Sequence, residues 1–315
     1  RIAVVELRCG LPHCGTMDLV RRFIFEKQPV RGHFVRLASA WRELRAHARY
    51  PQPVEELLGE AVAAAVLLAS SLKFRGTLTF QLQGNGAVRL LVAQCTHEFR
   101  LRALARFEES GLAELSAEGR RPSLFRRLVG SGGQLTVTIE ADEKGTRYQG
   151  VVPLEGSSLS ESLEAYFGTS EQLPTRVRVA ADADGCAGLL VQKMPGKAAG
   201  TDEGAWVDAE RGISRLQTAE LLNGPVEELL EHAFPDYDLR LFRGATVQFE
   251  CRCGEGRVAT LLRALGEEEV REVLKEQGSV TVTCEFCQRP YRFETSDVDA
   301  LFVQGEDTSG LGEIH

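Results

Sequence analysis

Two tight cysteine pairs constrain the end of this chain more than any other feature of the sequence. Cys251 and Cys253 have one residue between them, and Cys284 and Cys287 follow thirty residues later with two residues between them. If the chain folds back, the four thiolates can surround one metal ion as a tetrahedron, and zinc is the usual metal for four cysteine ligands. The sequence therefore predicts one Zn2+ per chain, held by these four residues in a structural rather than a catalytic site.

The spacing of the first pair leaves the role of this site open. Zinc sites more often have two residues between paired cysteines, and thiols as close as Cys251 and Cys253 can oxidise to each other when the metal is lost. Such a site can be a zinc ribbon that only staples a small domain, or it can be a redox switch. The spacing alone is compatible with both interpretations.

The length and the cysteine content limit the class of protein. A chain of 315 residues is expected to form two or three domains, and its 43% hydrophobic content is ample for a core. No stretch approaches the ~20 apolar residues of a membrane span, and we find no clear signal peptide. Eight cysteines are too few for a disulfide scaffold in a chain of this length, and tight pairs suit a reducing compartment. We expect a cytoplasmic protein without membrane partners.

The charge is distributed unevenly along the chain. Residues 17–199 carry 24 basic and 20 acidic side chains, a net charge of +4, whereas residues 200–246 carry 4 and 10, a net charge of −6. Residues 247–305 carry 7 and 11, a net charge of −4. A zinc module that binds nucleic acid should be basic, because phosphate contacts dominate the affinity. We therefore expect no nucleic-acid partner. The asymmetry can serve solubility alone, or it can mean that the acidic C-terminal third lies against the basic N-terminal part.

The first two hundred residues predict an α+β domain of mostly antiparallel sheets. Residues 54–72 form a long helix that is apolar on all sides in its second half, which is typical of a helix buried between layers. Shorter helices are expected at residues 39–47, with Ser39 as the N-terminal cap, and at 122–128 and 158–167. Alternating or continuous apolar runs predict strands at residues 19–25, 30–37, 77–83, 88–94, 98–105, 134–140, 147–153, 175–180 and 187–192.

No catalytic arrangement is recognisable in this domain. Gly130–Gly133 lacks the lysine and the serine or threonine of a phosphate-binding loop, so we interpret it as a plain loop. His33 and His97 are expected on strand surfaces, without ligand spacing. Cys95 and Cys186 are expected to be small buried residues. We therefore predict no enzyme.

Changes in composition suggest where the chain divides. Cys9 and Cys14 lie in a segment without amphipathic period, and we interpret both as incidental. The predicted parts are an extension at residues 1–16, an N-terminal α+β core at 17–199, a helical linker at 200–246, a zinc domain at 247–305 and a tail at 306–315.

Short helices are predicted in the linker. One is expected at residues 209–222, and a second is expected to begin with Pro225 as its first helical residue. The second carries an apolar stripe at helical spacing: Val226, Leu229, Leu230, Ala233 and Phe234. Helices this short are marginal alone, so the linker needs a surface to dock on.

The zinc domain is predicted to be small and dependent on its metal. Residues 280–282 and 291–293 form a hairpin around the second cysteine pair, and Thr295 or Ser296 caps a last helix that ends at Phe302. Because a domain of about sixty residues buries little apolar surface, its folding should be coupled to metal binding. Between the cysteine pairs, helical segments carry the apolar residues Val258, Leu261, Leu262 and Leu265, then Val270 and Leu274.

Residues along nearly the whole of 17–305 carry a family resemblance. The ending with Cys251, Cys253, Cys284 and Cys287 resembles the bacterial redox-regulated heat-shock protein 33 family of holdase chaperones. The same resemblance extends to five further motifs: Tyr50-Pro51-Gln52-Pro53-Val54, Leu82-Gln83-Gly84, Tyr148-Gln149-Gly150-Val151-Val152, Leu154-Glu155-Gly156 and Ser170-Glu171-Gln172-Leu173-Pro174-Thr175-Arg176. Residues 1–16 fall outside the pattern.

The resemblance implies an ATP-independent chaperone that is inactive when reduced and zinc-bound. Oxidation would release zinc, form two disulfides, unfold the linker and expose a surface for unfolding client proteins. The resemblance also implies that the reduced chain is a monomer, that the oxidised chain is a homodimer, and that clients are handed over to an ATP-dependent foldase chaperone. Four cysteines allow three pairings. The resemblance and the closeness in sequence both favour Cys251–Cys253 and Cys284–Cys287.

Two other functions account for part of the same sequence. A zinc-ribbon regulator that binds nucleic acid would explain the four cysteines, but the acidity of residues 247–305 counts against it. A thiol–disulfide oxidoreductase would use Cys284 and Cys287 catalytically, but such enzymes have a thioredoxin-like βαβ context that this sequence lacks. The redox-regulated chaperone is the function that the sequence supports best.

Overall fold

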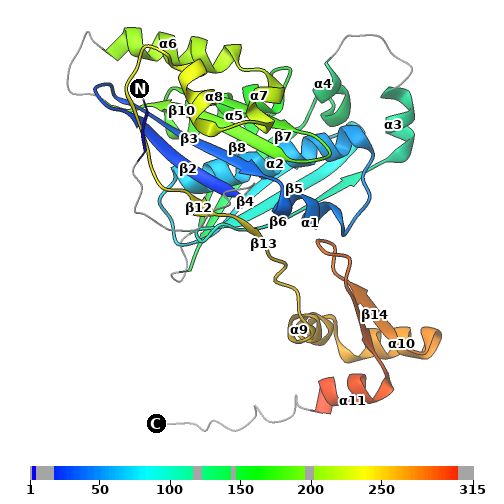
Figure 1. Cartoon of the computed structure of the whole chain (residues 1–315). Helices are drawn as coiled ribbons and strands as arrows, with labels where there is room; N and C mark the ends of the chain where they lie inside the picture. Colours follow the sequence, from blue (N-terminus) through cyan, green and yellow to red (C-terminus); the bar gives the residue numbers. More distant parts are fainter. Residues whose placement is uncertain (1, 5–17, 116–122, 143–146, 196–201, 304–315) are drawn as a thin grey trace, which may run out of the picture. The chain divides into compact units, whose positions relative to one another are not determined.

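The computed structural model (Figure 1) describes residues 2–4, 18–115, 123–142, 147–195 and 202–303. The chain divides into two compact units, Arg1–Glu250 and Cys251–His315, so the boundary falls directly before the first cysteine of the predicted metal site. The finer division of the first unit into a core and a linker stays a prediction.

The first unit contains a seven-stranded sheet. Its strand order is β1-β11-β2-β3-β10-β9, and β12 also pairs with β2. The strands are β1 Ile2–Val4, β2 Leu19–Phe25, β3 Val30–Leu37, β9 Thr175–Ala181, β10 Cys186–Lys193, β11 Leu239–Leu241 and β12 Ala245–Thr246.

The same unit contains a six-stranded sheet with the order β13-β6-β5-β4-β7-β8. Its strands are β4 Gly76–Gln83, β5 Val88–Thr96, β6 Arg100–Phe107, β7 Gln134–Ala141, β8 Arg147–Pro153 and β13 Gln248–Phe249. In the described part of the chain, only the β1–β11 and β13–β6 pairs are parallel. The predicted α+β fold with mostly antiparallel sheets is therefore confirmed.

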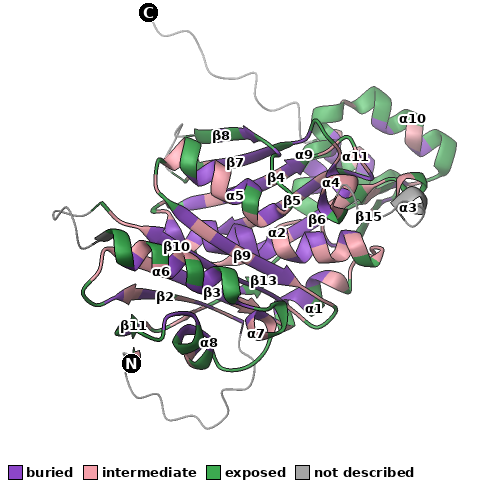
Figure 2. Ribbon diagram, turned by 90° about the horizontal axis from the view of Figure 1, so that it is seen from above, coloured by how far each residue is buried: buried purple, intermediate pink, exposed green. Residues whose placement is uncertain are grey.

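Helix α2, Gln52–Ser71, is buried between the two sheets. Figure 2 shows it in the middle of the unit, and its second half is buried on every side. Small residues on α2 allow the strands to lie close to the helix. A Cβ atom on Gly59 would lie only 2.4 Å from the Cβ of Ala181 in β9. The prediction of a long helix between layers is confirmed, because an all-apolar helix needs cover on both sides.

The remaining helices before residue 200 are short. They are α1 Ser39–Arg45, α3 Glu109–Leu115, α4 Leu124–Val129 and α5 Leu159–Tyr166, which continues as a π-helical turn, η1 Phe167–Glu171. Helix α3 was not predicted from the sequence. The loop at residues 130–133 lies against the β4–β5 turn, where Asn85 Oδ1 accepts a hydrogen bond from the Gly132 N–H at 3.3 Å.

The start of α1 differs from the prediction that Ser39 caps it. Ser39 is already helical, and the carboxylate of Asp18, just before β2, takes the capping role. It accepts hydrogen bonds from the backbone N–H groups of Ala38, Ser39 and Ala40, the last two at 3.0 and 2.8 Å. A tertiary contact therefore satisfies donors that a local serine was expected to satisfy.

Two histidines lie in other surroundings than the sequence predicted. His33 is not on a strand surface but is buried, with 2% of its surface exposed. Burial, and then the charges of Arg31 and Arg22, lower its pKa to about 3, so the ring is neutral at physiological pH. His97 follows β5 in a turn, where its Nδ1 accepts a hydrogen bond from the Gly76 N–H at 3.1 Å.

Three helices follow in the segment predicted as a linker: α6 Asp202–Arg215, α7 Thr218–Leu222 and α8 Val226–Ala233. The prediction of one helix over residues 209–222 is wrong, because the chain breaks after α6 and starts again at a capping box. There the Glu220 carboxylate accepts a hydrogen bond from the Gln217 N–H at 2.7 Å. Pro225 precedes α8 instead of forming its first helical residue.

The predicted apolar stripe of α8 is buried on the seven-stranded sheet. Val226, Leu229, Leu230, Ala233 and Phe234 are all buried. They share a core with apolar residues of β2, β3, β9 and β10, on the sheet face opposite α2. Figure 1 shows α6, α7 and α8 over this face. The predicted need of these short helices for a docking surface is thus met within the first unit.

Opposite charges accompany this apolar contact. Arg21 pairs with Glu227 at 2.7 Å, and Arg176 pairs with Glu210 at 2.8 Å. The Arg36 guanidinium donates to the Leu221 carbonyl at 2.9 Å. For these residues, the expected contact between an acidic segment and a basic core is confirmed. Each partly exposed ion pair contributes only ~0–1 kcal/mol, so the apolar stripe supplies most of the stabilisation.

The second unit is small and has its own core. Its elements are α9 Glu255–Leu265, α10 Glu267–Gln277, β14 Val280–Thr283, β15 Pro290–Phe293 and α11 Thr295–Val303, with β14 and β15 paired antiparallel. Val258 and Leu262 lie in the core as predicted. Leu261 and Leu265 do not, because 51% and 54% of their surfaces are exposed.

The beginning of the chain adds an unexpected strand. Ile2–Val4, within the predicted extension, pairs in parallel with β11. Cys9, Cys14 and residues 306–315 lie outside the described residues.

Among the helices in the described parts of the chain, none combines the length and hydropathy that crossing a membrane requires.

We predict that Asp18→Ala destabilises the first unit through the start of α1. Loss of the cap should lower the free energy of unfolding by about 1–2 kcal/mol. Urea unfolding followed by the fluorescence of Trp41, buried in α1, would measure it. Asp18→Asn, which retains an acceptor oxygen, should lose less. Equal losses in the two variants would contradict a capping role.

Candidate metal centre

The four cysteines come together in space, although thirty residues separate the two pairs in the sequence. The Sγ atoms of Cys251, Cys253, Cys284 and Cys287 all lie within 4.8 Å of one another. Cys251 Sγ is 3.6 Å from Cys284 Sγ, and Cys253 Sγ is 3.3 Å from Cys287 Sγ. The structure therefore brings together all four residues that the sequence predicted as ligands.

A tight hairpin turn presents the second pair. Between β14 and β15, the Cys284 N–H donates to the Arg289 carbonyl at 3.0 Å, and the Gln288 N–H donates to the Cys284 carbonyl at 2.8 Å. Gln288 has a φ of 53°, in the left-handed region. This turn directs the thiols of Cys284 and Cys287 to the same side.

The first pair lies on a segment without regular structure. Cys251 and Cys253 follow β13 and precede α9, whose N-terminal cap position is Gly254. The chain between Cys253 and Cys284 folds as two helices and a strand, and it returns the second pair to the first.

The donor set fits one tetrahedral ion. With Zn–S bonds of about 2.3 Å, tetrahedral geometry places sulfur atoms about 3.8 Å apart, close to the separations found here. Within the described residues, this is the only group of three or more histidine, cysteine, aspartate or glutamate side chains with metal-binding geometry. Four soft sulfur ligands suit zinc better than magnesium or calcium, which prefer oxygen.

Local hydrogen bonds distinguish the four thiols. Burial opposes ionisation of Cys253, but hydrogen bonds from the Tyr291 hydroxyl, at 3.1 Å, and from the other thiols outweigh it and lower its pKa to about 7. Burial, together with the neighbouring thiols, raises the pKa of Cys287 to about 12. Thiolates this close repel one another, so a bound cation is what allows all four to ionise together.

The other described cysteines take no part in this site. Cys95 and Cys186 are fully buried in the core of the first unit, as the sequence predicted. Burial raises the pKa of the Cys186 thiol, which makes it a poor nucleophile.

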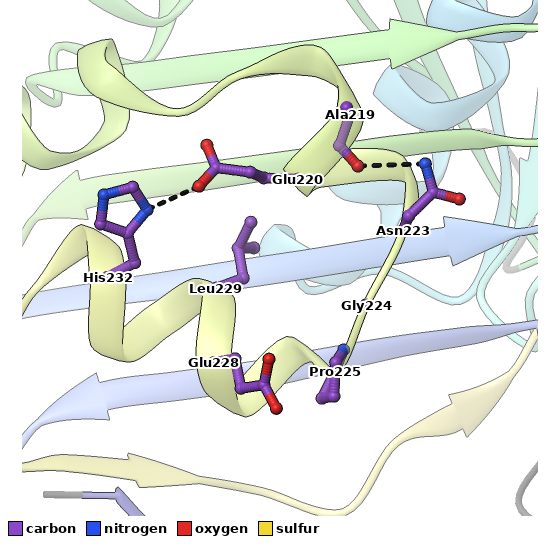
Figure 3. A pocket seen from close by; sticks show the side chains of 8 residues that line it. All are labelled: Ala219, Glu220, Asn223, Gly224, Pro225, Glu228, Leu229 and His232. Atoms are coloured by element: carbon purple, nitrogen blue, oxygen red, sulfur yellow. Dashed lines mark hydrogen bonds and ion pairs between the residues drawn. The ribbon is translucent and has the colours of Figure 1, made fainter.

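A second feature, which the sequence did not suggest, lies on the outer side of α7 and α8. A hollow of about 500 Å³ lies between these helices, lined by residues 219, 220, 223–225, 228, 229 and 232. Figure 3 shows the side chains that line it. The Glu220 carboxylate and His232 Nδ1 bridge it at 2.7 Å. The Gln217 N–H and then His232 lower the pKa of Glu220. This contact between Glu220 and His232 joins the two helices across the hollow.

Comparisons with known proteins agree with the sequence resemblance. Residues 18–294 match the family described as Hsp33 protein. The 33 kDa chaperonin of Nitrosococcus oceani is 40% identical over 290 residues, covering 91% of this chain and 95% of that protein. The 33 kDa chaperonin of Neisseria meningitidis serogroup A is 39% identical over 297 residues, covering 94% of each.

The fold also matches a solved structure. The crystal structure of the 33 kDa chaperonin (heat shock protein 33 homolog) from Thermotoga maritima superposes with a TM-score of 0.77 at 24% sequence identity. The match covers 93% of this chain and 100% of that chain.

We predict that the reduced chain binds one metal ion and that the cysteines of the second unit provide the ligands. Reduced protein loaded with zinc and dialysed against a weak chelator should keep one equivalent, measured by elemental analysis. Cys251→Ser combined with Cys284→Ser should lose it, because two of four ligands are removed. Cys95→Ala, which removes a thiol from the first unit, should keep it. Stoichiometric metal in the double variant would contradict the assignment.

Proposed function

Because this chain belongs to the heat-shock protein 33 family, we propose that it is a redox-regulated, ATP-independent chaperone that binds unfolding proteins and prevents their aggregation. The observation that carries the proposal is the docked helical segment. It covers an apolar sheet face, and after it the chain continues through β12 and β13 into Cys251. A change at the cysteines can therefore act on the cover of that face.

In the reduced state, Cys251, Cys253, Cys284 and Cys287 would hold one Zn2+ as thiolates. The ion would supply positive charge that offsets four thiolates and would staple a unit with a small core. Tyr291 would donate its hydrogen bond to the Cys253 thiolate, which weakens that sulfur as a nucleophile. A compartment that keeps thiols reduced, such as the cytoplasm, suits this state.

Oxidation would remove the donors. Four thiolates react with two peroxide molecules, lose four electrons in all, and form two disulfides, while the peroxide oxygens leave as hydroxide. Sulfurs joined in disulfides no longer bind the ion. The reduced geometry does not select the pairing, because in a tetrahedral cluster every sulfur neighbours every other. We propose Cys251–Cys253 and Cys284–Cys287, since these partners stay close when the unit unfolds.

The docked segment is suited to release. Fixing a residue costs ~1–2 kcal/mol of backbone entropy, so three short helices stay docked only while their apolar side chains are buried. The exposed Glu220–His232 pair and the hollow in Figure 3 indicate that α7 and α8 support each other weakly. Loss of a folded second unit would free the far end of the segment and favour undocking.

Undocking would expose an aromatic surface. Phe23, Phe25 and Phe34 contribute to the sheet face that α6 and α8 cover, and the ring centroids of Phe25 and Phe234 are 5.1 Å apart. Exposed apolar surface of this kind binds unfolding proteins through the hydrophobic effect. We also propose that the reduced chain is a monomer, that the oxidised chain dimerises, and that clients pass to an ATP-dependent foldase chaperone.

We predict the disulfide pairing of the oxidised state. Peroxide treatment at raised temperature followed by peptide mapping should recover Cys251–Cys253 and Cys284–Cys287 as the main species. Neighbouring cysteines with one residue between them lie ~7 Å apart in a straight strand, near the limit for a disulfide, so residues 251–253 must bend. Recovery of mainly Cys253–Cys284 bridges would refute this pairing.

A second prediction concerns the masking role of α8. Leu229→Ala combined with Leu230→Ala should give a chaperone that suppresses client aggregation without oxidant while zinc stays bound. Each buried truncation costs about 2–5 kcal/mol, enough to undock a marginal segment. Leu261→Ala, at an exposed position of α9, is the matched control and should stay inactive when reduced. A reduced double variant that is equally inactive would argue against masking.

A further inference from the structure

A short strap joins the two units in sequence and covers one edge of the six-stranded sheet. The strap consists of residues 247–250, and its centre is β13. The Gln248 N–H donates to the Phe99 carbonyl at 3.1 Å, and the Glu250 N–H donates to the Leu101 carbonyl at 2.9 Å. It therefore pairs in parallel with the beginning of β6.

Side chains hold the strap in an alternating pattern. Val247 is buried in the core, and Phe249 lies against it with its ring centroid 5.1 Å from that of His47. Glu250 carries its carboxylate 3.5 Å from Arg100 Nε. The pattern is apolar, polar, apolar, acidic, which is the pattern of an extended segment on a half-exposed edge.

The edge beneath the strap is longer than the strap. Strand β6 has eight residues, whereas β13 has two. The Ala105 N–H donates to the Tyr50 hydroxyl at 3.3 Å, so Tyr50 reaches the far part of this edge. Departure of the strap would free the backbone groups that now bond it, at Phe99 and Leu101. Free edge groups of this kind are a template for another strand.

A pocket continues the edge at its near end. It has a volume of about 520 Å³ and is lined by residues 69, 70, 72–75, 97 and 99. Phe99 is one of the residues that line this pocket. Its backbone lies in the left-handed region, with a φ of 60°, which is strained for a bulky residue. Lys73, Arg75 and His97 lie on its wall beside Phe74 and Phe99. An apolar or acidic side chain of an incoming segment would find a matching environment there.

We infer that the strap is a reversible plug, and that an extended segment of an unfolding protein replaces it on β6 by strand addition. Glu250 directly precedes Cys251, so unfolding around oxidised cysteines removes the constraint on the end of the strap. The sequence of the strap indicates which kind of segment can replace it. Such a segment has apolar residues at alternate positions, backbone N–H groups that are free to donate, and an acidic residue that can pair with Arg100. This inference deepens the proposed chaperone function and rests on it for the identity of the partner.

The test uses the full chain and a synthetic peptide that repeats the strap's Val-Gln-Phe-Glu sequence. A second peptide carries methyl groups on alternate backbone nitrogens, which removes the donors needed for strand pairing and leaves the side chains unchanged. Fluorescence anisotropy measures binding of each labelled peptide to reduced and to peroxide-treated protein. Oxidised protein should bind the first peptide at least tenfold more tightly than reduced protein does, and methylation should remove that gain.

A pair of variants separates release of the strap from oxidation. Gln248→Pro removes the N–H that bonds Phe99, at an exposed position, whereas Gln248→Ala keeps it. Reduced, zinc-loaded Gln248→Pro should bind the unmethylated peptide without peroxide, and Gln248→Ala should not. Hydrogen exchange at the Leu101 and Ala103 amides, slowed by the bound peptide, locates the site even if the proline variant loses stability.

The outcomes distinguish a failure of strand addition on β6 from a failure of the proposed chaperone function. Equal binding of both peptides by oxidised protein, or no slowing of exchange in β6, overturns strand addition. If that protein still suppresses aggregation of an unfolding client, the chaperone function stands without it. If oxidised protein suppresses no aggregation, the chaperone proposal fails, and peptide binding still decides whether β6 accepts a strand.

Discussion

The seven-stranded sheet needs apolar cover on both of its faces, and much of the first unit follows from this constraint. Strand β10 is buried along nearly its whole length, because α2 lies on one side of it and α6 to α8 lie on the other. On the side of α2, the second sheet completes a core. On the other side, the cover is a segment of three short helices that could not persist alone.

The cover is held by contacts that differ in strength. Phe234 sits among Phe23 and Phe25, and Gly212 lets α6 approach α8, since a Cβ there would lie 2.2 Å from the Ala233 carbonyl oxygen. Around this apolar centre, Arg21 and Arg176 pair with glutamates in partly solvated positions. The close contacts fix the position of the helices on the sheet, and the free energy of docking is modest. Both properties suit a mask that can be released reversibly.

The order of elements along the chain connects the cover to the cysteines. After α8, the chain adds β11 and β12 to the first sheet, then β13 to the second, and then reaches Cys251. Short strands that come late in the sequence are thus added to both sheets, and β1 from the start of the chain pairs with the outer side of β11. Short edge strands contribute few hydrogen bonds each, so they depend on what fixes the chain beyond them.

The sequence by itself determined the long strands, the buried helix and the four cysteines that come together in space, because periodicity and cysteine spacing are local properties. Three of its errors have one common cause. Asp18 caps α1 from another element, His33 is buried by α2, and Leu261 points away from a core that its spacing suggested. The two-residue strand β13 and the strand Ile2–Val4 carry no period at all. Only the tertiary structure decided these features, because each depends on which distant surface a residue meets and not on its neighbours in the chain.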